Sequence, residues 1–292
     1  MKPYQWMVNY TPQTEWIDRR GILIWLAFYT GGLAGGLYLV SLYFNNLWGM
    51  FISWLIMLVL KGGFHLAYLG KPLRFWRIIL KPGTSWIARG LIFVVLFIGF
   101  AAIQLAFSYW LPGTVWEVIF KVLAGIMAFA VAIYTGFVMN YVNGIPLWNS
   151  ALLPVLFILC GILGGFGLIT AIALGGGNVD IVAAEAGSRA LLITTALFIA
   201  IYLWSATYMG PLGRQSVVEL LQGRIAPIFW IGIVLCGIII PIAISVSSYF
   251  AGEASAPLLI TAITCEIIGG LALRYCLLKG GMYAPLIQTS TY

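Results

Sequence analysis

The chain has 292 residues, of which 62% are hydrophobic and only 8% are charged. Soluble domains carry about 25% charged residues, so this composition excludes an ordinary soluble protein and indicates an integral membrane protein. The net charge of +7 is therefore a signal of membrane topology and does not indicate nucleic-acid binding.

Eight long apolar stretches follow one another along the chain, and each is long enough to cross about 30 Å of hydrocarbon. Glycine, proline and asparagine residues mark the joins, for example at Pro112-Gly113 and Gly210-Pro211. The predicted fold class is an all-α integral membrane protein with short loops and two four-helix bundles. We expect its eight transmembrane helices at residues 21–44, 47–69, 90–111, 116–140, 150–174, 187–209, 226–249 and 257–278.

The segment 61–90, between the second and third apolar runs, is rich in cations. It contains six of the fifteen Lys and Arg residues and His65, the single histidine of the sequence. Pro72 and Pro82 disfavour helix at the residues that precede them. The aromatic and basic residues between these prolines are typical of a segment at the membrane interface. An ordinary basic cytoplasmic loop is the alternative interpretation of the same composition.

The distribution of cations predicts the orientation in the membrane. With an even number of spans, both termini lie on one side, here called side A, together with the loops after the second, fourth and sixth helices. Thirteen of the fifteen cations, Lys2 among them, fall on side A, and only Lys121 and Arg189 fall on side B. The positive-inside rule therefore predicts that side A and both termini face the cytoplasm, with the protein in the inner (cytoplasmic) membrane.

One histidine and four scattered cysteines limit the redox centres that the protein could hold. A haem b normally needs two strong axial ligands, and no group of Cys, His and carboxylate residues has the spacing of a metal site. We therefore expect no haem and no iron–sulfur cluster in this protein. Any electrons would come from, or go to, a partner.

Several polar residues of the first four helices lie toward side A. Polar groups inside a membrane are costly and are commonly functional. These residues lie at roughly one depth, as a pocket in a helix bundle requires. Glycines on the first helix would let a flat ligand, or simply another helix, approach closely. An apolar slot edged by a few polar groups suits a quinone. Each residue also has a structural interpretation, such as a belt tyrosine or a snorkelling arginine. The candidate lining residues are Tyr29, Gly32, Gly35, Gly36, His65, Arg89 and Tyr134.

Glu266 lies in the middle of the eighth predicted helix, where an unpaired carboxylate is expensive. A structural hydrogen bond and a possible proton path are equally compatible with this position. Glu117 and Lys121, four residues apart in the fourth predicted helix, are expected to form a plain surface ion pair near side B.

The segment that follows the second predicted helix resembles the corresponding loop of the NrfD/PsrC family, the polysulfide reductase-type membrane subunits. The resemblance lies in Tyr68-Leu69-Gly70-Lys71-Pro72-Leu73-Arg74-Phe75, and in the later Pro82, Ser85-Trp86 and Arg89-Gly90. The glycine-rich first helix, with Gly32-Leu33-Ala34-Gly35-Gly36, resembles the first helix of the family. The fourth helix and the loop after it are similar in Ile133-Tyr134-Thr135-Gly136 and Pro146-Leu147-Trp148-Asn149.

The resemblance implies a quinone-binding membrane anchor that exchanges electrons between the quinone pool and a four-cluster ferredoxin-like iron–sulfur subunit. A molybdopterin catalytic subunit usually completes such a complex, and menaquinone is favoured over ubiquinone. Tyr134 resembles the family tyrosine that hydrogen-bonds the quinone. The sequence departs from the family at Ile24 and Ala27, where the polysulfide reductase subunit carries Asn and His. It also has Tyr68 where dimethyl-sulfoxide-type anchors carry His, and His65, one turn earlier, could substitute.

These observations combine into one hypothesis for the whole protein. Residues 1–20 are an N-terminal cytoplasmic segment, residues 21–140 form the quinone-site bundle with the basic loop 61–90, and residues 141–292 form a supporting bundle. A secondary transporter, which would need broken helices and charge pairs at the midplane, and a structural anchor without a quinone site are the alternatives. The iron–sulfur partner is expected to dock on side A against Lys71, Arg74, Arg77 and Arg214.

Overall fold

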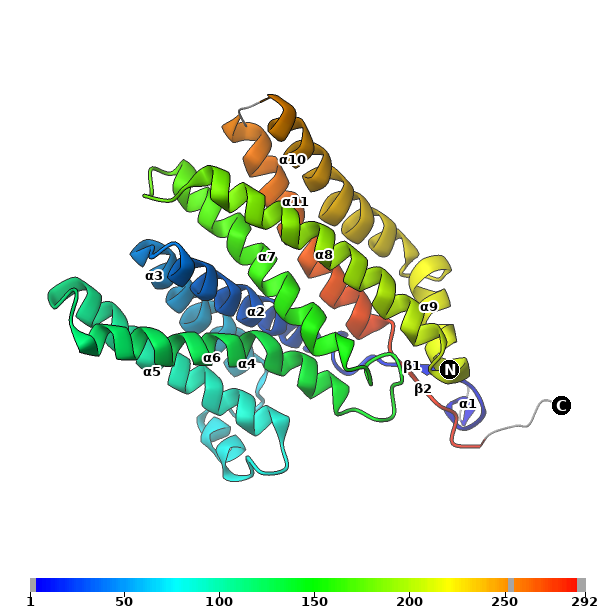
Figure 1. Ribbon diagram of the computed structural model, residues 1–292. Coiled ribbons are helices and arrows are strands. Elements are labelled where there is room, and N and C mark those ends of the chain that lie inside the picture. Colours follow the sequence, from blue (N-terminus) through cyan, green and yellow to red (C-terminus); the bar gives the residue numbers. More distant parts are fainter. Residues whose placement is uncertain (1–3, 252–254, 288–292) are drawn as a thin grey trace.

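The computed structural model describes residues 4–251 and 255–287, and almost all of them are helical (Figure 1). Lys2, which contributes to the predicted charge bias, lies outside the described residues. Within the described part, eight spans are long and apolar enough to cross a membrane. They are α2 (Gly21–Tyr43), the continuous run α3–η1–α4 (Leu47–Leu55, Ile56–Lys61, Gly62–Tyr68), α5 (Trp86–Trp110), α6 (Val115–Asn140), α7 (Leu152–Leu174), α8 (Ile181–Thr207), η3–α10 (Ile228–Ile239, Ile240–Ala251) and α11 (Ala256–Lys279). The predicted fold class and its eight spans are confirmed.

Two spans begin earlier than the apolar pattern predicts, because capping residues start them. The Ser85 side chain accepts a hydrogen bond from the Ala88 amide at 3.3 Å, so α5 begins four residues before the predicted start. Asp180 accepts from the amides of Val182 and Ala183 at 3.0 and 3.2 Å, and α8 begins six residues early. A charged residue near the start of each helix, Arg89 in α5 and Glu185 in α8, hid these starts from a search for apolar runs.

Two spans contain π-helical turns, η1 in the second and η3 in the seventh. A π-helical turn contains one extra residue, which changes the direction of the side chains that follow it. Such turns are frequent at functional sites. The remaining elements lie on side A. They are the short helix α1 (Gln5–Val8), the strands β1 (Thr11–Pro12) and β2 (Met282–Tyr283), the 3₁₀ helix η2 (Pro72–Leu80) and the helix α9 (Gly210–Gln222). The helix α9 was not predicted.

Both described ends of the protein lie at one end of the helix assembly, together with α9, as Figure 1 shows. The turns between α5 and α6 and between α7 and α8, the end of α10 and the start of α11 lie at the opposite end. Strand β1 pairs with β2 in an antiparallel arrangement, with Thr11 opposite Tyr283. This pairing ties the N-terminal segment to the residues after α11, so both segments lie on side A.

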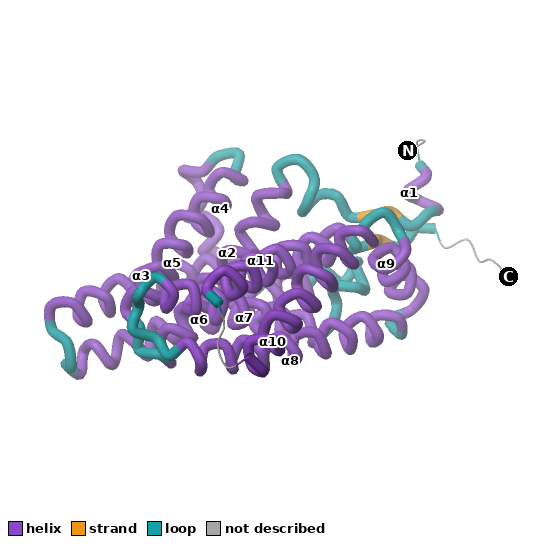
Figure 2. Tube along the Cα trace, turned by 90° about the horizontal axis from the view of Figure 1, so that it is seen from above, coloured by secondary structure: helices purple, strands orange, loops and turns teal. Residues whose placement is uncertain are grey.

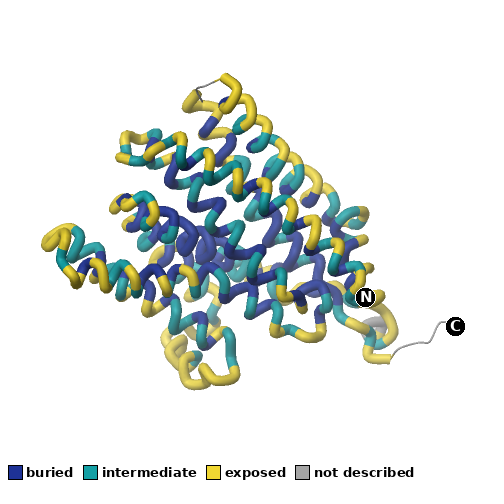
Figure 3. Tube along the Cα trace, in the orientation of Figure 1, coloured by how far each residue is buried: buried dark blue, intermediate teal, exposed yellow. Residues whose placement is uncertain are grey.

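Helix α2 lies at the centre, where buried residues concentrate (Figures 2 and 3). Its most extensive contacts are with α7, and it also packs against α6 and the second span. Small residues allow the α2–α7 contact, since a Cβ atom on Gly165 of α7 would lie 2.6 Å from the carbonyl of Gly36. The extensive α2–α7 contact crosses the proposed boundary at residue 140, and the division into two four-helix bundles stays a prediction.

The structure corrects the boundaries of the basic loop. Residues 61–68 are helical and belong to the second span, and the Lys61 side chain is only 1% exposed. Arg274, counted as a cation of side A, is 2% exposed inside the bundle. Without these two residues side A still carries most of the cations, so the predicted orientation is unchanged.

Candidate functional site

A lysine and a tyrosine from different spans meet inside the membrane region. Lys61 Nζ donates a hydrogen bond to Tyr134 Oη at 2.7 Å, and both side chains are buried. The ammonium group lies 5.4 Å from the ring centroid of Phe28 and 5.1 Å from that of Tyr134. Aromatic faces attract cations and partly replace the lost hydration shell. The pair therefore combines a positive charge with a hydroxyl group in apolar surroundings.

Local backbone features place this pair. Lys61 is the last residue of the π-helical segment η1, and it lies seven residues, or about 10 Å, from the side-A end of α4. Gly31 on α2 leaves room for it, because a Cβ atom there would lie 3.0 Å from Lys61 Cδ and Cε. Gly90 on α5 does the same for Tyr134, since a Cβ atom at Gly90 would overlap the phenol ring. Two glycines from different helices thus make space for the Lys61–Tyr134 pair.

The side chain of Arg274, on α11, reaches Gly32 of α2, the residue that follows Gly31. Its guanidinium lies 4.1 Å from the ring centroid of Phe157, and Nη2 donates to the Phe157 carbonyl at 3.3 Å. A Cβ atom on Gly32 would collide with Nη2, so this glycine is needed for the arginine to fit. Atoms Nε and Nη1 are buried without a hydrogen-bond partner among the described residues. We call Lys61, Tyr134 and Arg274 the cation cluster.

The cation cluster has no acidic partner in the described part of the protein. The ion pairs there join Lys121 to Glu117 and Lys279 to Asp18, and neither involves the cluster. Buried cations without a counter-charge are costly in a membrane and mark functional sites. Tyr134 uses its oxygen as the acceptor for Lys61, so its own hydroxyl proton remains available. The arrangement is a set of hydrogen-bond donors suited to a ligand with acceptor oxygens.

His65 lies one turn from Lys61 on the same span. Its ring centroid is 6.4 Å from that of Phe28, the same ring over which the Lys61 ammonium lies. Its Nδ1 atom is buried and has no hydrogen-bond partner among the described residues. The structure therefore brings His65 and Tyr134 into one region, although no direct contact joins them.

Other predicted site residues point elsewhere. Gly35 faces α6, where a Cβ atom would lie 2.6 Å from the Ala128 carbonyl, and Gly36 faces the backbone of α7. Both glycines serve close helix contacts. Arg89 is exposed and donates to the carbonyls of Pro82 and Gly83, each at 2.8 Å, which holds the turn before α5.

Tyr29 contacts α11 at Gly270. A Cβ atom on Gly270 would lie 2.9 Å from its ring. With Glu266, Tyr29 lines a small cavity that is described below. The predicted residues Tyr29 and Glu266 thus lie together, separate from the Lys61–Tyr134 pair.

The expected docking residues are exposed on side A. Lys71 precedes η2, Arg74 and Arg77 lie on it, and Arg214 lies on α9. No residue of η2 is buried, and Figure 3 shows its surface as exposed. Near it, a surface recess of about 670 Å³ lies between the N-terminal segment and Tyr68-Leu69-Gly70 at the end of α4.

The sequence also matches known proteins. The profile of the family described as "Polysulphide reductase, NrfD" aligns with residues 20–285, which include all eight spans. The chain belongs to the NrfD family. The resemblance in the segment after the second span is thereby confirmed, and the protein is a multi-pass membrane member of this family.

Three relatives of this NrfD protein show modest identity. The C subunit of polysulfide reductase from Wolinella succinogenes is 26% identical over 170 residues, 55% of this protein and 53% of the relative. Protein NrfD of Escherichia coli is 25% identical over 246 residues, 75% of this protein and 76% of the relative. A Protein NrfD homolog of Haemophilus influenzae is 25% identical over 168 residues, 55% of this protein and 52% of the relative. The chain thus spans about half the length of the first and third relatives.

Lys61 and Arg274 of the NrfD protein were not predicted as site residues, and both were assigned to the charge bias. The depth of both residues inside apolar spans was the signal in the sequence that could have identified them as site residues. Lys61 lies seven residues and Arg274 five residues inside the side-A end of an apolar span. Cations that deep are costly unless they are held in place, and a count of charges by loop overlooks this.

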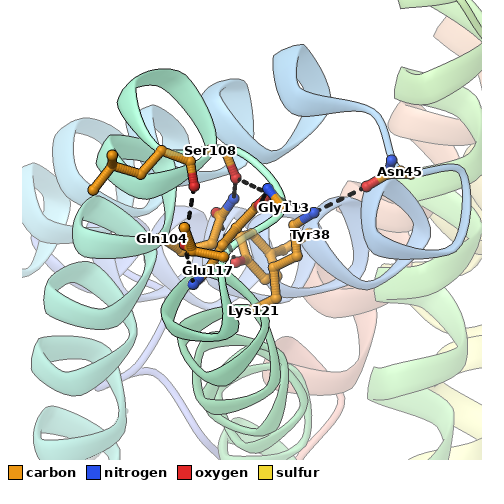
Figure 4. Close-up of polar contacts among 9 residues, drawn as sticks. Tyr38, Asn45, Gln104, Ser108, Gly113, Glu117 and Lys121 are labelled. Atoms are coloured by element: carbon orange, nitrogen blue, oxygen red, sulfur yellow. Dashed lines mark hydrogen bonds and ion pairs between the residues drawn. The ribbon is translucent and has the colours of Figure 1, made fainter.

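A second polar cluster of the NrfD protein lies near side B, around Glu117 (Figure 4). Glu117 Oε1 accepts from Ser108 Oγ at 2.7 Å and pairs with Lys121 Nζ at 2.8 Å, and Oε2 accepts from the Gly113 amide at 2.7 Å. Lys121 also donates to Asn45 at 3.1 Å. The predicted ion pair is confirmed, but it is not a plain surface pair, because Glu117 is 7% exposed.

The hydrogen bonds continue from Glu117 into the core. Ser108 accepts from Gln104 Nε2 at 2.8 Å, and Gln104 Oε1 accepts from Tyr38 Oη at 3.0 Å. Tyr38 and Gln104 are completely buried. Each oxygen of the Glu117 carboxylate has at least one donor, so we call this the Glu117 network and assign it a structural role that joins α2, α5 and α6.

Proposed function

We propose that this NrfD-family protein is a quinone-binding membrane anchor of a respiratory oxidoreductase complex. The quinone, for which the family resemblance favours menaquinone, binds beside Tyr134 and Lys61. Electrons pass between it and an iron–sulfur partner on side A. The observation that carries the proposal is the buried Lys61–Tyr134 hydrogen bond, which lacks an acidic partner in the described residues.

The donors of the cation cluster fit the chemistry of a quinone head group. A quinone supplies two carbonyl oxygens that accept hydrogen bonds and take up electrons and protons. Tyr134 donates its free hydroxyl proton in a hydrogen bond to one carbonyl oxygen. Lys61 polarises that hydroxyl and stabilises negative charge that develops on the carbonyl oxygen, an effect that is strongest where water is excluded. The free nitrogens of Arg274 add to the same positive field.

His65 supports proton exchange at the cluster. An imidazole can both accept and donate a proton, and the Nδ1 atom of His65 is buried without a hydrogen-bond partner among the described residues. His65 and Tyr68 continue the helix face that begins at Lys61, since they are four and seven residues further along. Tyr68 lines the recess of about 670 Å³ at the side-A surface. This face provides a path for protons between the buried pair and side A.

The exposed cations near the recess support docking of the partner. Lys71, Arg74, Arg77 and Arg214 form a positive surface that would attract an acidic face of an iron–sulfur subunit, and a molybdopterin subunit would complete the complex. The charge bias places this surface in the cytoplasm. In cells or sealed vesicles, K71C and R214C should therefore be labelled by a membrane-impermeant maleimide only when it reaches the cytoplasmic face. Labelling from the other face would contradict the orientation.

The quinone site is tested with Y134F in the complex isolated with its partner subunits. The change removes the hydroxyl proton and the acceptor for Lys61. Quinol-dependent turnover should fall by roughly 10- to 100-fold, in line with the loss of one positioned donor. Turnover of the partner with artificial electron donors should remain unchanged.

The control for Y134F is Y141F, seven residues further along the sequence. Tyr141 is 64% exposed, so its change should leave both activities intact. Quinol-dependent turnover of Y134F equal to that of Y141F would remove the proposed site.

A further inference from the structure

A small cavity lies on the other side of α2 from the Lys61–Tyr134 pair. Its volume is about 30 Å³, enough for a water molecule, and it is enclosed by residues of α2, α7, α8, η3 and α11. Most of the wall is aliphatic. The polar residues on the wall are Tyr29, Cys160, Thr195 and Glu266.

Two polar atoms at this cavity are buried and have no partner among the described residues, Glu266 Oε2 and Thr195 Oγ1. The other carboxylate oxygen, Oε1, accepts from Ser188 Oγ at 2.9 Å. Gly167 leaves space beside Oε2, since a Cβ atom there would lie 3.1 Å away. A small cavity with two unsatisfied polar atoms on its wall is a site for bound water.

Glu266 is distinctive among the acidic residues that the structure describes. It lies ten residues from the start of α11 and thirteen from its end, so it is near the middle of the membrane. Glu117 lies in the first turn of α6, and Glu185 is the fifth residue of α8. A carboxyl group at this depth is expensive and needs a function or a strong partner. The single hydroxyl of Ser188 does not replace the hydration that the carboxylate has lost.

The cavity and the cation cluster are neighbours. Arg274 follows Leu273, and Leu273 lines the cavity. The ring that Arg274 covers belongs to Phe157, one turn before Cys160, which also lines the cavity. The unsatisfied Nε and Nη1 atoms of Arg274 can donate hydrogen bonds to water between the cavity and the cation cluster. On the other side, Ser188 lies seven residues from the side-B end of α8.

We propose that Glu266, with a water molecule held by Glu266, Thr195 and Tyr29, is a proton-exchange site that links the quinone site to side B. The inference rests on the proposed function. Oxidation of one quinol releases two electrons, which go to the iron–sulfur partner on side A, and two protons. One of these protons passes through water to the carboxylate of Glu266, forms the carboxylic acid, and then leaves toward side B past Ser188. The other proton leaves toward side A along the helix face that carries His65 and Tyr68. Reduction of a quinone runs these steps in reverse.

The test uses the complete complex in sealed liposomes, with side B facing a trapped pH indicator. In E266Q, the number of protons that appear in the lumen per quinol oxidised should fall about tenfold, because a positioned proton carrier contributes at least that much. T195V, which removes only the hydroxyl that holds the water, should lower the number of protons released per quinol several-fold. Unchanged proton release per quinol in both variants would overturn the inference.

T194V is the matched control, because Thr194 is partly exposed, does not line the cavity and bonds to the carbonyl of Ala190 in its own helix. It should behave like the wild type. Other results would contradict the proposed function itself: an unaltered complex that oxidises no quinol, or a Y134F complex with unchanged quinol-dependent turnover. Normal quinol turnover with unchanged proton release in E266Q would remove only the proton-exchange site.

Infrared difference spectra between the oxidised and reduced complex provide a readout that does not depend on turnover. Protonation of Glu266 should produce a carboxyl C=O stretching band that is present in T194V and missing in E266Q. The absence of this band from the wild type, or its persistence in E266Q, would contradict the proposal.

Discussion

The cation cluster and the Glu117 network are both buried polar groups in a membrane protein, but they differ in how their hydrogen-bonding capacity is used. Each carboxylate oxygen of Glu117 has a donor, and its charge is balanced by Lys121. Lys61 and Arg274 have only neutral acceptors, and two nitrogens of Arg274 have none among the described residues. A satisfied network holds helices together, whereas an unsatisfied one is prepared for a ligand. This difference supports the proposal that the quinone chemistry takes place at the cation cluster and not at the Glu117 network.

The largest effect should come from removal of the charge at the unsatisfied cluster. K61M retains the aliphatic part of the side chain and removes the ammonium group, so quinol turnover should fall by roughly 10²- to 10³-fold, as for loss of a charge-stabilising donor. Thermal stability in detergent should remain the same or rise, since a buried cation without a counter-charge is removed. A large loss of stability together with a small loss of turnover would reverse the assignment of the two clusters.

The next largest effect should be on stability at the Glu117 network. E117A leaves the Ser108 hydroxyl and the Gly113 amide without an acceptor, at roughly 1–3 kcal/mol for each buried group left unpaired. The unfolding temperature should fall clearly, while quinol turnover per folded complex should stay close to that of the wild type. E117Q, which keeps an acceptor oxygen in place, should lose less stability than E117A. A selective loss of turnover in E117A would show that the network takes part in the chemistry.

A smaller effect is expected where α2 contacts α7. In G36A the new methyl group overlaps the backbone carbonyl of Gly161, and such overpacking costs about 1–3 kcal/mol. G99A is the matched control, because nothing lies within 4 Å of a Cβ atom there and alanine is the better helix former. Thermal unfolding should therefore separate the two variants. Equal unfolding temperatures would show that α2 and α7 can move apart around the new methyl group without a loss of stability.

The smallest effect should come from the exposed end of the Glu117 network. The Lys121 side chain is 24% exposed, and partly solvated ion pairs contribute about 0–1 kcal/mol. K121M should therefore lower the free energy of unfolding by much less than E117A. If its cost approached that of E117A, the charge pair and not the hydrogen bonds would hold the network together.

The hydrophobic pattern predicted the fold because each span must cover its own backbone polar groups and fill the membrane thickness. It therefore identified eight spans and their order. The capped starts of α5 and α8 were missed, because a charged residue, Arg89 or Glu185, follows closely on each start and interrupts the apolar run. The π-helical turn that ends at Lys61 leaves no mark in the apolar pattern, so the direction of this side chain could not be predicted.

The candidate site was predicted in part. Tyr134 and His65 were selected from their position near side A. In the structure, Tyr134 accepts a hydrogen bond from Lys61, and His65 lies beside the Phe28 ring over which the Lys61 ammonium lies. Lys61 and Arg274 were assigned to the charge bias, because a sequence records the order of charges and not their burial. The glycines of α2 were selected as one group, but Gly31 and Gly32 make room for cations while Gly35 and Gly36 face helix backbones.

By itself, the sequence determined the membrane location, the number of spans and the family, since these depend on composition, run length and local motifs. Only the tertiary structure decided which polar residues face one another. Contacts between α2, the second span, α6 and α11 join residues that are distant in the sequence, such as Lys61 and Tyr134, which are 73 positions apart. Whether a buried charge is satisfied depends on these contacts, because its partners come from other helices.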